Sequence, residues 1–326
     1  MDTGTHFVTG IALGGLATVD PIVFNSPETA QAVVFATIIG SQIPDVDTVL
    51  KFKNNASYIR NHRGITHSIP AVILWPIFLL MFLYPIFPEA NLLHLWLWTS
   101  IAVFLHVFMD IFNAYGTQAL RPFSSKWIAL GWINTFDLFL FSILLLGSLL
   151  WLFGMDPRDV FPAIFVIIIG YYLLRYTIRK TIYETLKRRF PEAEKIILNP
   201  TFRFFRWRVA VVTKDKFYVA RAYRRDIILL DEYKRLPLPD EPIMQIAKSD
   251  KNISAFLSFS PVYRWEMETE DGITEIRFID LRYRSKNHYP FVAFVQIDDS
   301  LNILSSYTGW IYNVDKFKKK FETIPG

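Results

Sequence analysis

The sequence predicts an α-helical polytopic membrane domain followed by a cytoplasmic, mainly antiparallel β domain. Up to about Arg175 the chain consists of long apolar runs with few charges, whereas from there to Gly326 charged, aromatic and β-branched residues alternate. The 326 residues are enough for two domains. We therefore expect a membrane-embedded domain over residues 1–180, a basic linker helix over 181–198 and a soluble β-rich domain over 199–326.

Apolar segments in the first half are long enough to cross a bilayer, because about 20 helical residues span ~30 Å of hydrocarbon. The clear candidates are Ser68–Phe87, Leu92–Tyr115, Asn134–Phe153 and Val160–Tyr176. Two shorter segments punctuated by glycine precede them, His6–Val19 and Glu28–Ile43, and predict a thin or re-entrant helical hairpin.

The charges of the loops predict how these segments are oriented across the membrane. Lysine and arginine are concentrated in Lys51–Arg63, in the loop after Gly116 and in the tail after Arg175, whereas the alternate loops around Glu89 and Asp156 are poor in both. Because basic loops stay on the cytoplasmic side, we expect a multi-pass protein of the bacterial cytoplasmic membrane with its C-terminal domain in the cytoplasm.

Ionisable side chains gather at the predicted cytoplasmic end of the apolar segments. They are His6, Asp45, Asp47, His62, His67, His106 and Asp110, with Asp137 at a similar expected depth. Such groups at the edge of hydrocarbon are costly unless they pair with one another or hold a metal ion.

The spacing within this group favours a metal. His106 and Asp110 stand four residues apart on one helix face, and the carboxylates of Asp45 and Asp47 point the same way in extended backbone. The chain has no cysteine, so any ion is held by nitrogen and oxygen, as suits zinc, manganese or iron. Each residue also has an ordinary alternative, such as a helix–helix hydrogen bond, a helix cap or a lipid contact. Independent roles of that kind do not explain a common depth.

Four motifs together resemble a known family. They are His6, then Pro44-Asp45-Val46-Asp47, then His62-Arg63-Gly64-Ile65-Thr66-His67-Ser68, then His106-Val107-Phe108-Met109-Asp110. This pattern is similar to that of the YfhP- and YdjM-like membrane-bound metal-dependent hydrolases of bacteria, also described as LexA-binding and associated with the inner membrane. The motifs lie within about the first 140 residues.

The His106–Asp110 pair and the Thr66-His67-Ser68 element also resemble zinc-dependent phospholipase C, a helical phosphodiesterase with clustered metal ions. That resemblance implies His67, His106 and Asp110 as ligands, with Asp45 or Asp47 as another ligand or as a base. A cluster of three ions needs more ligands than this, but the sequence has no further histidine between His106 and His288. The sequence therefore favours one or two ions.

Beyond residue 199 the pattern predicts β-hairpins. Arg206–Thr213 pairs with Phe217–Tyr223, Tyr263–Glu270 with Ile273–Arg284, and Pro290–Ile297 with Leu301–Tyr307. We expect one twisted sheet or small barrel of about six strands, with a C-terminal helix near Val314–Phe321. Basic and acidic residues nearly balance here, which argues against a nucleic-acid domain.

The leading hypothesis is a membrane hydrolase with a divalent metal, first of all zinc, as one or two ions. His6, Asp45, His67, His106 and Asp110 are the expected metal ligands, and His62, Asp47 and Arg63 the expected catalytic residues. The expected partners are membrane lipid and an ester, first a phosphoester, of a lipid or lipid-linked molecule.

Two alternatives remain. A membrane-anchored regulator would bind a protein or DNA through its C-terminal domain, and a transporter would relay protons through the polar cluster. A relay should penetrate the bilayer, whereas these groups stop near one face.

Overall fold

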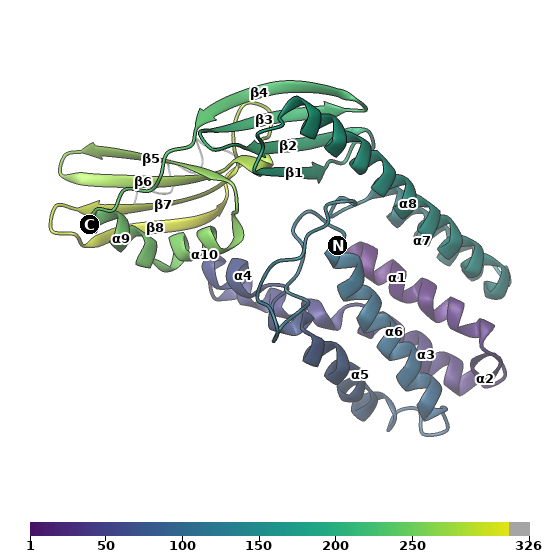
Figure 1. Cartoon of the computed structure of the whole chain (residues 1–326). Coiled ribbons are helices and arrows are strands. Elements are labelled where there is room, and N and C mark those ends of the chain that lie inside the picture. Colours follow the sequence, from purple (N-terminus) through teal and green to yellow (C-terminus); the bar gives the residue numbers. More distant parts are fainter. Residues whose placement is uncertain (313–326) are drawn as a thin grey trace. The chain divides into compact units, whose positions relative to one another are not determined.

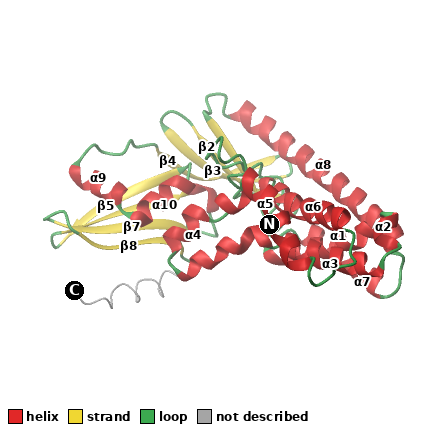
Figure 2. Cartoon of the chain, turned by 90° about the horizontal axis from the view of Figure 1, so that it is seen from below, coloured by secondary structure: helices red, strands yellow, loops and turns green. Residues whose placement is uncertain are grey.

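The computed structural model describes residues 1–312, which form two compact units. The first unit is helical and consists of residues 1–48, 61–181 and 199–206. The second holds residues 49–60, 182–198 and the chain from Trp207 onward. Helices and strands thus separate as the sequence predicts, into an N-terminal helical part and C-terminal antiparallel sheets (Figure 1, Figure 2).

The helices of the N-terminal part are mostly short. Their bounds are α1 (Thr3–Leu16), η1 (Ala17–Val19), α2 (Pro21–Phe24), α3 (Pro27–Gly40), η2 (Ile43–Phe52), α4 (Asn55–Asn61), η3 (Ile65–His67), α5 (Ile69–Leu83), α6 (Leu92–Ile111), α7 (Leu138–Leu152) and α8 (Pro157–Arg189). Side-chain caps set many of their starts, since Asp2, Ser26, Ser68, Asn91 and Asp137 each accept a hydrogen bond from a backbone amide of the first turn.

Helices α1 and α3 form the predicted glycine-punctuated hairpin and pack closely together. A β-carbon on Gly10 of α1 would lie 2.7 Å from the Cα of Ile38 on α3. Only glycine therefore lets the two backbones approach this far. The close packing positions His6 of α1 beside the helices that follow.

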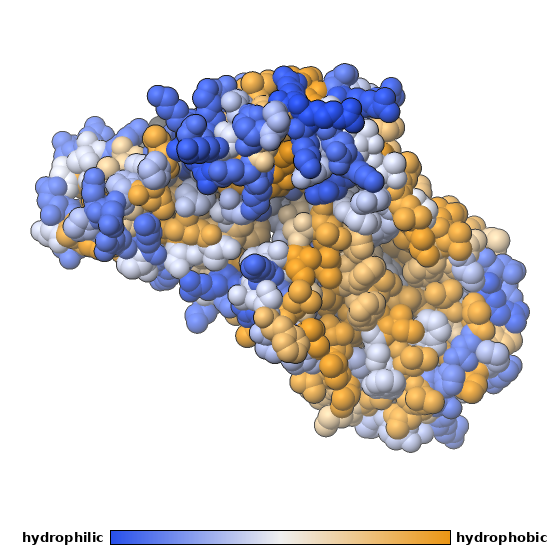
Figure 3. All heavy atoms as spheres, viewed as in Figure 1, coloured by the Kyte–Doolittle hydropathy of each residue, from blue (hydrophilic) through white to orange (hydrophobic). Residues whose placement is uncertain are grey.

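Several helices are suited to a membrane. Helices α6 and α8 are each long and apolar enough to cross one, and two bent pairs, α3 with η2 and α4/η3 with α5, pass the same test together. Helices α5 and α7 have 15 residues each and rise only about 22 Å, so they are shorter than the spans predicted for them. The described residues thus hold two to four candidate spans. Apolar side chains dominate the visible face of the helical unit (Figure 3).

Helix α8 is one continuous element of 33 residues. The sequence predicted a span over Val160–Tyr176 and a basic linker helix over 181–198. The structure joins the two up to Arg189, and strand β1 already begins at Lys195. No proline or glycine lies between Tyr171 and Arg189, so nothing in the chain breaks the helix there.

The second unit contains two four-stranded sheets, with the orders β1-β2-β3-β4 and β5-β6-β7-β8. The strands are β1 (Lys195–Pro200), β2 (Arg206–Val212), β3 (Lys216–Tyr223), β4 (Asp226–Lys234), β5 (Tyr263–Glu270), β6 (Ile273–Asp280), β7 (Phe291–Asp298) and β8 (Ile303–Trp310). Between the sheets the chain forms α9 (Pro242–Ser249) and α10 (Lys251–Phe259). The β5–β6 turn has positive φ at both Asp271 and Gly272, as a two-residue hairpin requires.

The three predicted hairpins are present, but the prediction of one sheet or barrel of about six strands was wrong. Strands β1 and β4 add to the first sheet, and α9 and α10 were not foreseen. Strand β4 was missed because its side chains are mostly half-buried or exposed, so it lacks a clear apolar alternation. The predicted helix near Val314–Phe321 lies outside the described residues.

The two sheets share a core and a polar contact. Val212 and Phe217 of the first sheet belong to the same apolar cluster as Val262 and Leu281, which directly adjoin β5 and β6 of the second. Asp231 of β4 accepts hydrogen bonds from Arg284 and from the Tyr289 hydroxyl, 2.6 Å away. Burial by itself would raise the pKa of Asp231, but these two hydrogen bonds outweigh it and hold that pKa below its usual value.

The second unit also takes in a segment from the first half of the chain. The Nδ2 of Asn55 donates to the carbonyl of Thr308 (3.2 Å), and Arg60 donates to the hydroxyl of Ser254 (2.6 Å). Residues 49–60, a basic loop in the sequence, therefore pack with the C-terminal sheets.

A buried ion pair stabilises the end of β6. Asp280 is fully buried and accepts hydrogen bonds from the Ser260 hydroxyl (2.7 Å) and from the backbone and guanidinium of Arg282. In the variant Asp280→Ala, the buried guanidinium of Arg282 would lose its carboxylate partner. We expect local unfolding around β6 to become easier by about 3–5 kcal/mol, measured by amide hydrogen exchange of the full-length protein. Glu268→Ala, at an exposed position of β5, is the control and should change little. Equal protection in both variants would contradict this account.

Candidate metal centre

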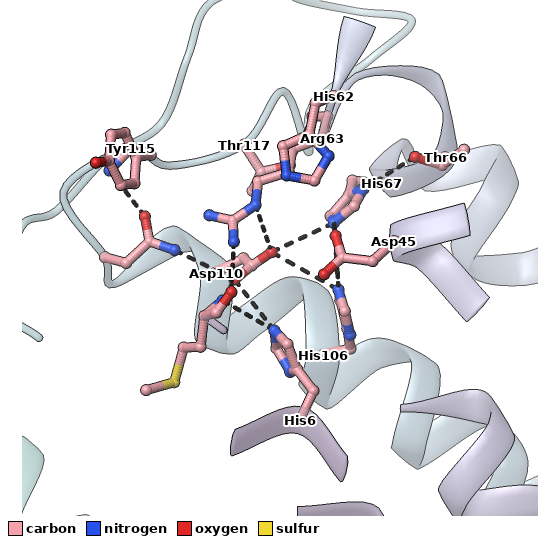
Figure 4. Close-up of polar contacts among 12 residues, drawn as sticks. His6, Asp45, His62, Arg63, Thr66, His67, His106, Asp110, Tyr115 and Thr117 are labelled. Atoms are coloured by element: carbon pink, nitrogen blue, oxygen red, sulfur yellow. Dashed lines mark hydrogen bonds and ion pairs between the residues drawn. The ribbon is translucent and has the colours of Figure 1, made fainter. Parts of the chain in front are cut away.

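The predicted ionisable residues come from four segments that meet at one end of the helical unit. Helix α1 contributes His6, η2 contributes Asp45 and Asp47, the α4–α5 connection contributes His62, Arg63 and His67, and α6 contributes His106 and Asp110. Figure 4 shows the side chains of His6, Asp45, Arg63, His67 and His106 gathered around Asp110.

Four of these residues bring ligand atoms together. Asp45, His67, His106 and Asp110 each offer one atom, and these atoms all lie within 4.8 Å of one another. The Nε2 of His67 is 3.3 Å from Oδ2 of Asp110 and 3.5 Å from Oδ1 of Asp45. The Nε2 of His106 is 3.7 Å from the same two oxygens. The helix spacing of His106 and Asp110 therefore does place both on one site.

Hydrogen bonds to the far side of each ring decide which nitrogen faces the centre. The Nδ1 of His106 donates to the carbonyl of Ser41 (2.6 Å). The Thr66 hydroxyl donates to Oδ2 of Asp47 (2.7 Å), so it accepts from Nδ1 of His67 (3.0 Å). In the neutral rings both Nε2 atoms then carry lone pairs.

These two Nε2 atoms lie only 3.3 Å apart. Two facing lone pairs repel one another unless a cation lies between them or one ring is protonated. Oδ1 of Asp45 and Oδ2 of Asp110 are buried and have no hydrogen-bond partner among the described residues. The donor set therefore fits a cation held by two imidazoles and two carboxylates, which is a common environment for zinc.

The two carboxylate oxygens of Asp110 face different partners. Its Oδ2 faces His67 and His106, whereas its Oδ1 lies 3.3 Å from Nε2 of His6 and forms an ion pair with the amino group of Met1. The ring of His6 stacks on His106 with 3.7 Å between centroids. His6 therefore lies beside the four-residue group, across the Asp110 carboxylate, and not within it.

Asp47 and His62 form a pair next to this group. Oδ1 of Asp47 lies 2.7 Å from Nδ1 of His62, and its Oδ2 accepts from the backbone amide of Arg63 (2.8 Å) and from Thr66. Asp45, Asp47 and His62 also offer ligand atoms within 4.8 Å of one another. The side chain of His62 is 19% exposed, whereas those of His67 and His106 are fully buried.

Arg63 is buried and faces Asp110. Its backbone has φ +61°, and its carbonyl accepts hydrogen bonds from Thr117 and Gln118 in the loop after α6. Nε of Arg63 lies 3.1 Å from Oδ2 of Asp110, and Nη2 donates to the carbonyl of Met1 (2.7 Å). Arg63 thus compensates charge within the centre, and a role toward a phosphate stays a prediction.

Asp137 does not belong to the cluster of ionisable residues, whereas Ser41 and Thr66 support it through hydrogen bonds. Asp137, expected at a similar depth, caps α7 and accepts a hydrogen bond from the Tyr171 hydroxyl (2.8 Å). In the sequence Thr66 stands out only as part of a motif, and nothing there indicates Ser41, whose carbonyl orients His106. No sequence signal identifies a backbone carbonyl as an orienting group.

The family follows from comparison with known proteins. Residues 1–182 match the family described as YdjM inner membrane protein. Residues 191–233 match the YfhP middle domain, and residues 242–321 match the YfhP C-terminal alpha/beta plait domain. The chain therefore belongs to the YdjM family of inner membrane proteins, which confirms the resemblance seen in the motifs.

One relative matches throughout. The chain is 56% identical over 323 residues to the uncharacterized protein YfhP of Bacillus subtilis (strain 168), and the match covers 99% of both chains. No solved structure matches.

The first prediction for the centre concerns metal content. His106→Ala removes one of the four converging ligands, so we expect affinity for zinc to fall by more than the roughly 10–100-fold that loss of a supporting residue costs. Elemental analysis and zinc titration of detergent-purified protein measure this. The matched control is His94→Ala, because His94 lies on the same helix but pairs with Asp20. Unchanged metal content in His106→Ala would show that the cluster holds no metal.

The second prediction concerns orientation. Thr66→Val keeps the shape of the side chain but removes the hydroxyl that accepts from His67. We expect zinc affinity to fall by about 10–100-fold without loss of the fold. Thr117→Val, which removes a hydroxyl that donates to the carbonyl of Arg63, should affect affinity less. Equal affinities in the two variants would mean that Thr66 does not orient a ligand.

Proposed function

We propose that this protein is a multi-pass membrane hydrolase with a divalent metal centre, zinc being the first candidate, that cleaves an ester at the cytoplasmic face of the membrane. The main support is the pair of inward-facing Nε2 atoms of His67 and His106, which lie 3.3 Å apart beside buried carboxylate oxygens of Asp45 and Asp110. A bound cation would relieve the repulsion between the two nitrogen lone pairs and compensate the buried carboxylates.

The donor set guides the choice of ion. Two imidazole nitrogens and two carboxylate oxygens suit zinc in tetrahedral or five-fold coordination, and thiolate-selective ions are disfavoured because the chain has no cysteine. Asp110 and His6 would hold a second ion. The amino group of Met1 now pairs with Asp110 on that side.

Reactivity would be divided between the ion and the chain's own residues. A bound divalent ion supplies an activated water and polarises a phosphoryl or acyl oxygen. Asp47 holds His62 through Nδ1, an arrangement that orients an imidazole to accept or donate a proton. Since His62 is the partly exposed histidine of the group, it is our candidate for the proton transfer. The guanidinium of Arg63, with Nε 3.1 Å from Oδ2 of Asp110, would compensate the charge of that carboxylate.

The position of the cluster suggests the substrate. It lies at the ends of candidate spans, near exposed apolar side chains such as Val46 and Ile65 (43% and 68% exposed). Lysine and arginine in the adjoining loops favour a cytoplasmic position for this end, because basic loops tend to stay on that side. An ester within a lipid or lipid-linked molecule, first a phosphodiester, would reach the centre at headgroup depth.

A membrane-anchored regulator is the second candidate. The observation in its favour is that the second unit has its own core and two sheets, with a family-defined alpha/beta plait region. A regulator should keep its cellular function in a His67→Ala/Asp110→Asn double variant and lose it when the chain after Asn199 is removed. A hydrolase should lose its cellular function in the double variant.

The hydrolase is tested with purified, zinc-loaded protein in nanodiscs. We expect it to cleave bis(p-nitrophenyl) phosphate or a short-chain phospholipid, and to lose that activity with a chelator. His62→Ala should lower kcat by about 10²–10⁴-fold while metal content is retained, because proton transfer contributes that much. His94→Ala is the control. A metal-loaded protein that cleaves neither substrate would contradict the hydrolase and leave the regulator.

A further inference from the structure

The segment Asn199–Arg206 connects β1 to β2, yet it packs within the helical unit. Its central anchor is Arg175 of α8, which is only 1% exposed and donates to the carbonyl of Phe204 (2.5 Å) and to that of Trp132 (3.1 Å). The Phe204 ring also lies against Tyr171, with 6.0 Å between centroids. A loop of the C-terminal domain is thus held by a helix that is a candidate membrane span.

This anchoring leaves Phe202 on the outside. Phe202 is 62% exposed, and its ring stacks on that of Phe136 at an interplanar angle of 15°. Phe136 immediately precedes Asp137, the N-cap of α7. The first residues of α7, Leu138 and Phe139, are also exposed, 51% and 42%. Phe202 therefore continues an apolar surface that begins on α7 itself.

The charged residues around this segment are all basic. Arg203 is exposed, Arg206 is half-buried, and there is no acidic residue between Glu194 and Asp215. Aromatic rings beside arginines are typical of the boundary between hydrocarbon and headgroups, where the arginines meet anionic lipid. A soluble surface loop would not ordinarily expose a large ring that continues an apolar helix face.

We propose that Phe202 and Arg203 form a second membrane anchor, which inserts into the anionic headgroup region of the leaflet at the start of α7. The C-terminal domain is then attached to the bilayer at two places, through α8 and through the β1–β2 loop. Two observations support this anchor: the chain belongs to a family of inner membrane proteins, and Arg175 of α8 holds the β1–β2 loop. Neither depends on the metal centre. Loss of the metal would leave the anchor intact.

The absence of cysteine makes the chain suited to a direct test, because a single introduced thiol takes a spin label without any other change. Labels are placed by Phe202→Cys and, to avoid disturbing the ring stack, by Arg203→Cys. Leu146→Cys, on an exposed face of α7, is the lipid reference, and Lys214→Cys, in the β2–β3 turn, is the water reference. The full-length protein is studied in nanodiscs with phosphatidylglycerol.

The measured quantity is the accessibility of each label to oxygen, which concentrates in lipid, relative to a water-soluble nickel chelate. We expect ratios for both loop labels between the two references, and a shift toward the water reference in purely zwitterionic discs or at high salt. The label at Leu146 should not shift. A loop ratio equal to that at Lys214 would overturn the proposal, as would labels shielded from both reagents, which would indicate a protein partner.

Discussion

The carboxylate of Asp110, buried at the end of α6, is the constraint on which the centre depends. It receives Arg63 on one oxygen and His6 with the Met1 amino group on the other. A fully buried carboxylate is costly unless charge and hydrogen bonds surround it. The packing of α1 against α3 and the turn at Arg63 bring those partners into place.

The histidines around it are oriented from outside the centre. His106 is fixed by a backbone carbonyl and His67 by a hydroxyl that Asp47 in turn holds. This arrangement resembles that of many metal sites, in which groups behind the ligands determine the tautomer. The facing nitrogens that result would repel one another in the neutral rings unless a cation lies between them. Folding of this end of the helical unit and binding of an ion are therefore expected to be coupled.

The chain is not divided simply into a first and a second half. Residues 49–60 pack with the C-terminal sheets through Asn55 and Arg60, and residues 199–206 pack with the helices through Arg175. Each unit therefore holds a short segment that its position in the sequence would assign to the other. The segment that holds Asp45 and Asp47 leads directly into residues 49–60. The metal ligands and the C-terminal sheets are thus connected by a few residues of chain.

The sequence by itself determined the helical and β parts, three hairpins, the family and the residues of the polar cluster. It could do so because apolar run length, alternation, turn residues and the spacing of His106 and Asp110 are local properties. Only the tertiary structure decided which of those residues converge. His6 lies across the carboxylate of Asp110 from the other ligands, and Asp47 pairs with His62. Asp137 lies outside the cluster and caps α7. The tertiary structure also decided that the strands form two sheets. These outcomes depend on long-range packing and on backbone carbonyls such as that of Ser41, which no pattern of side chains along the chain reveals.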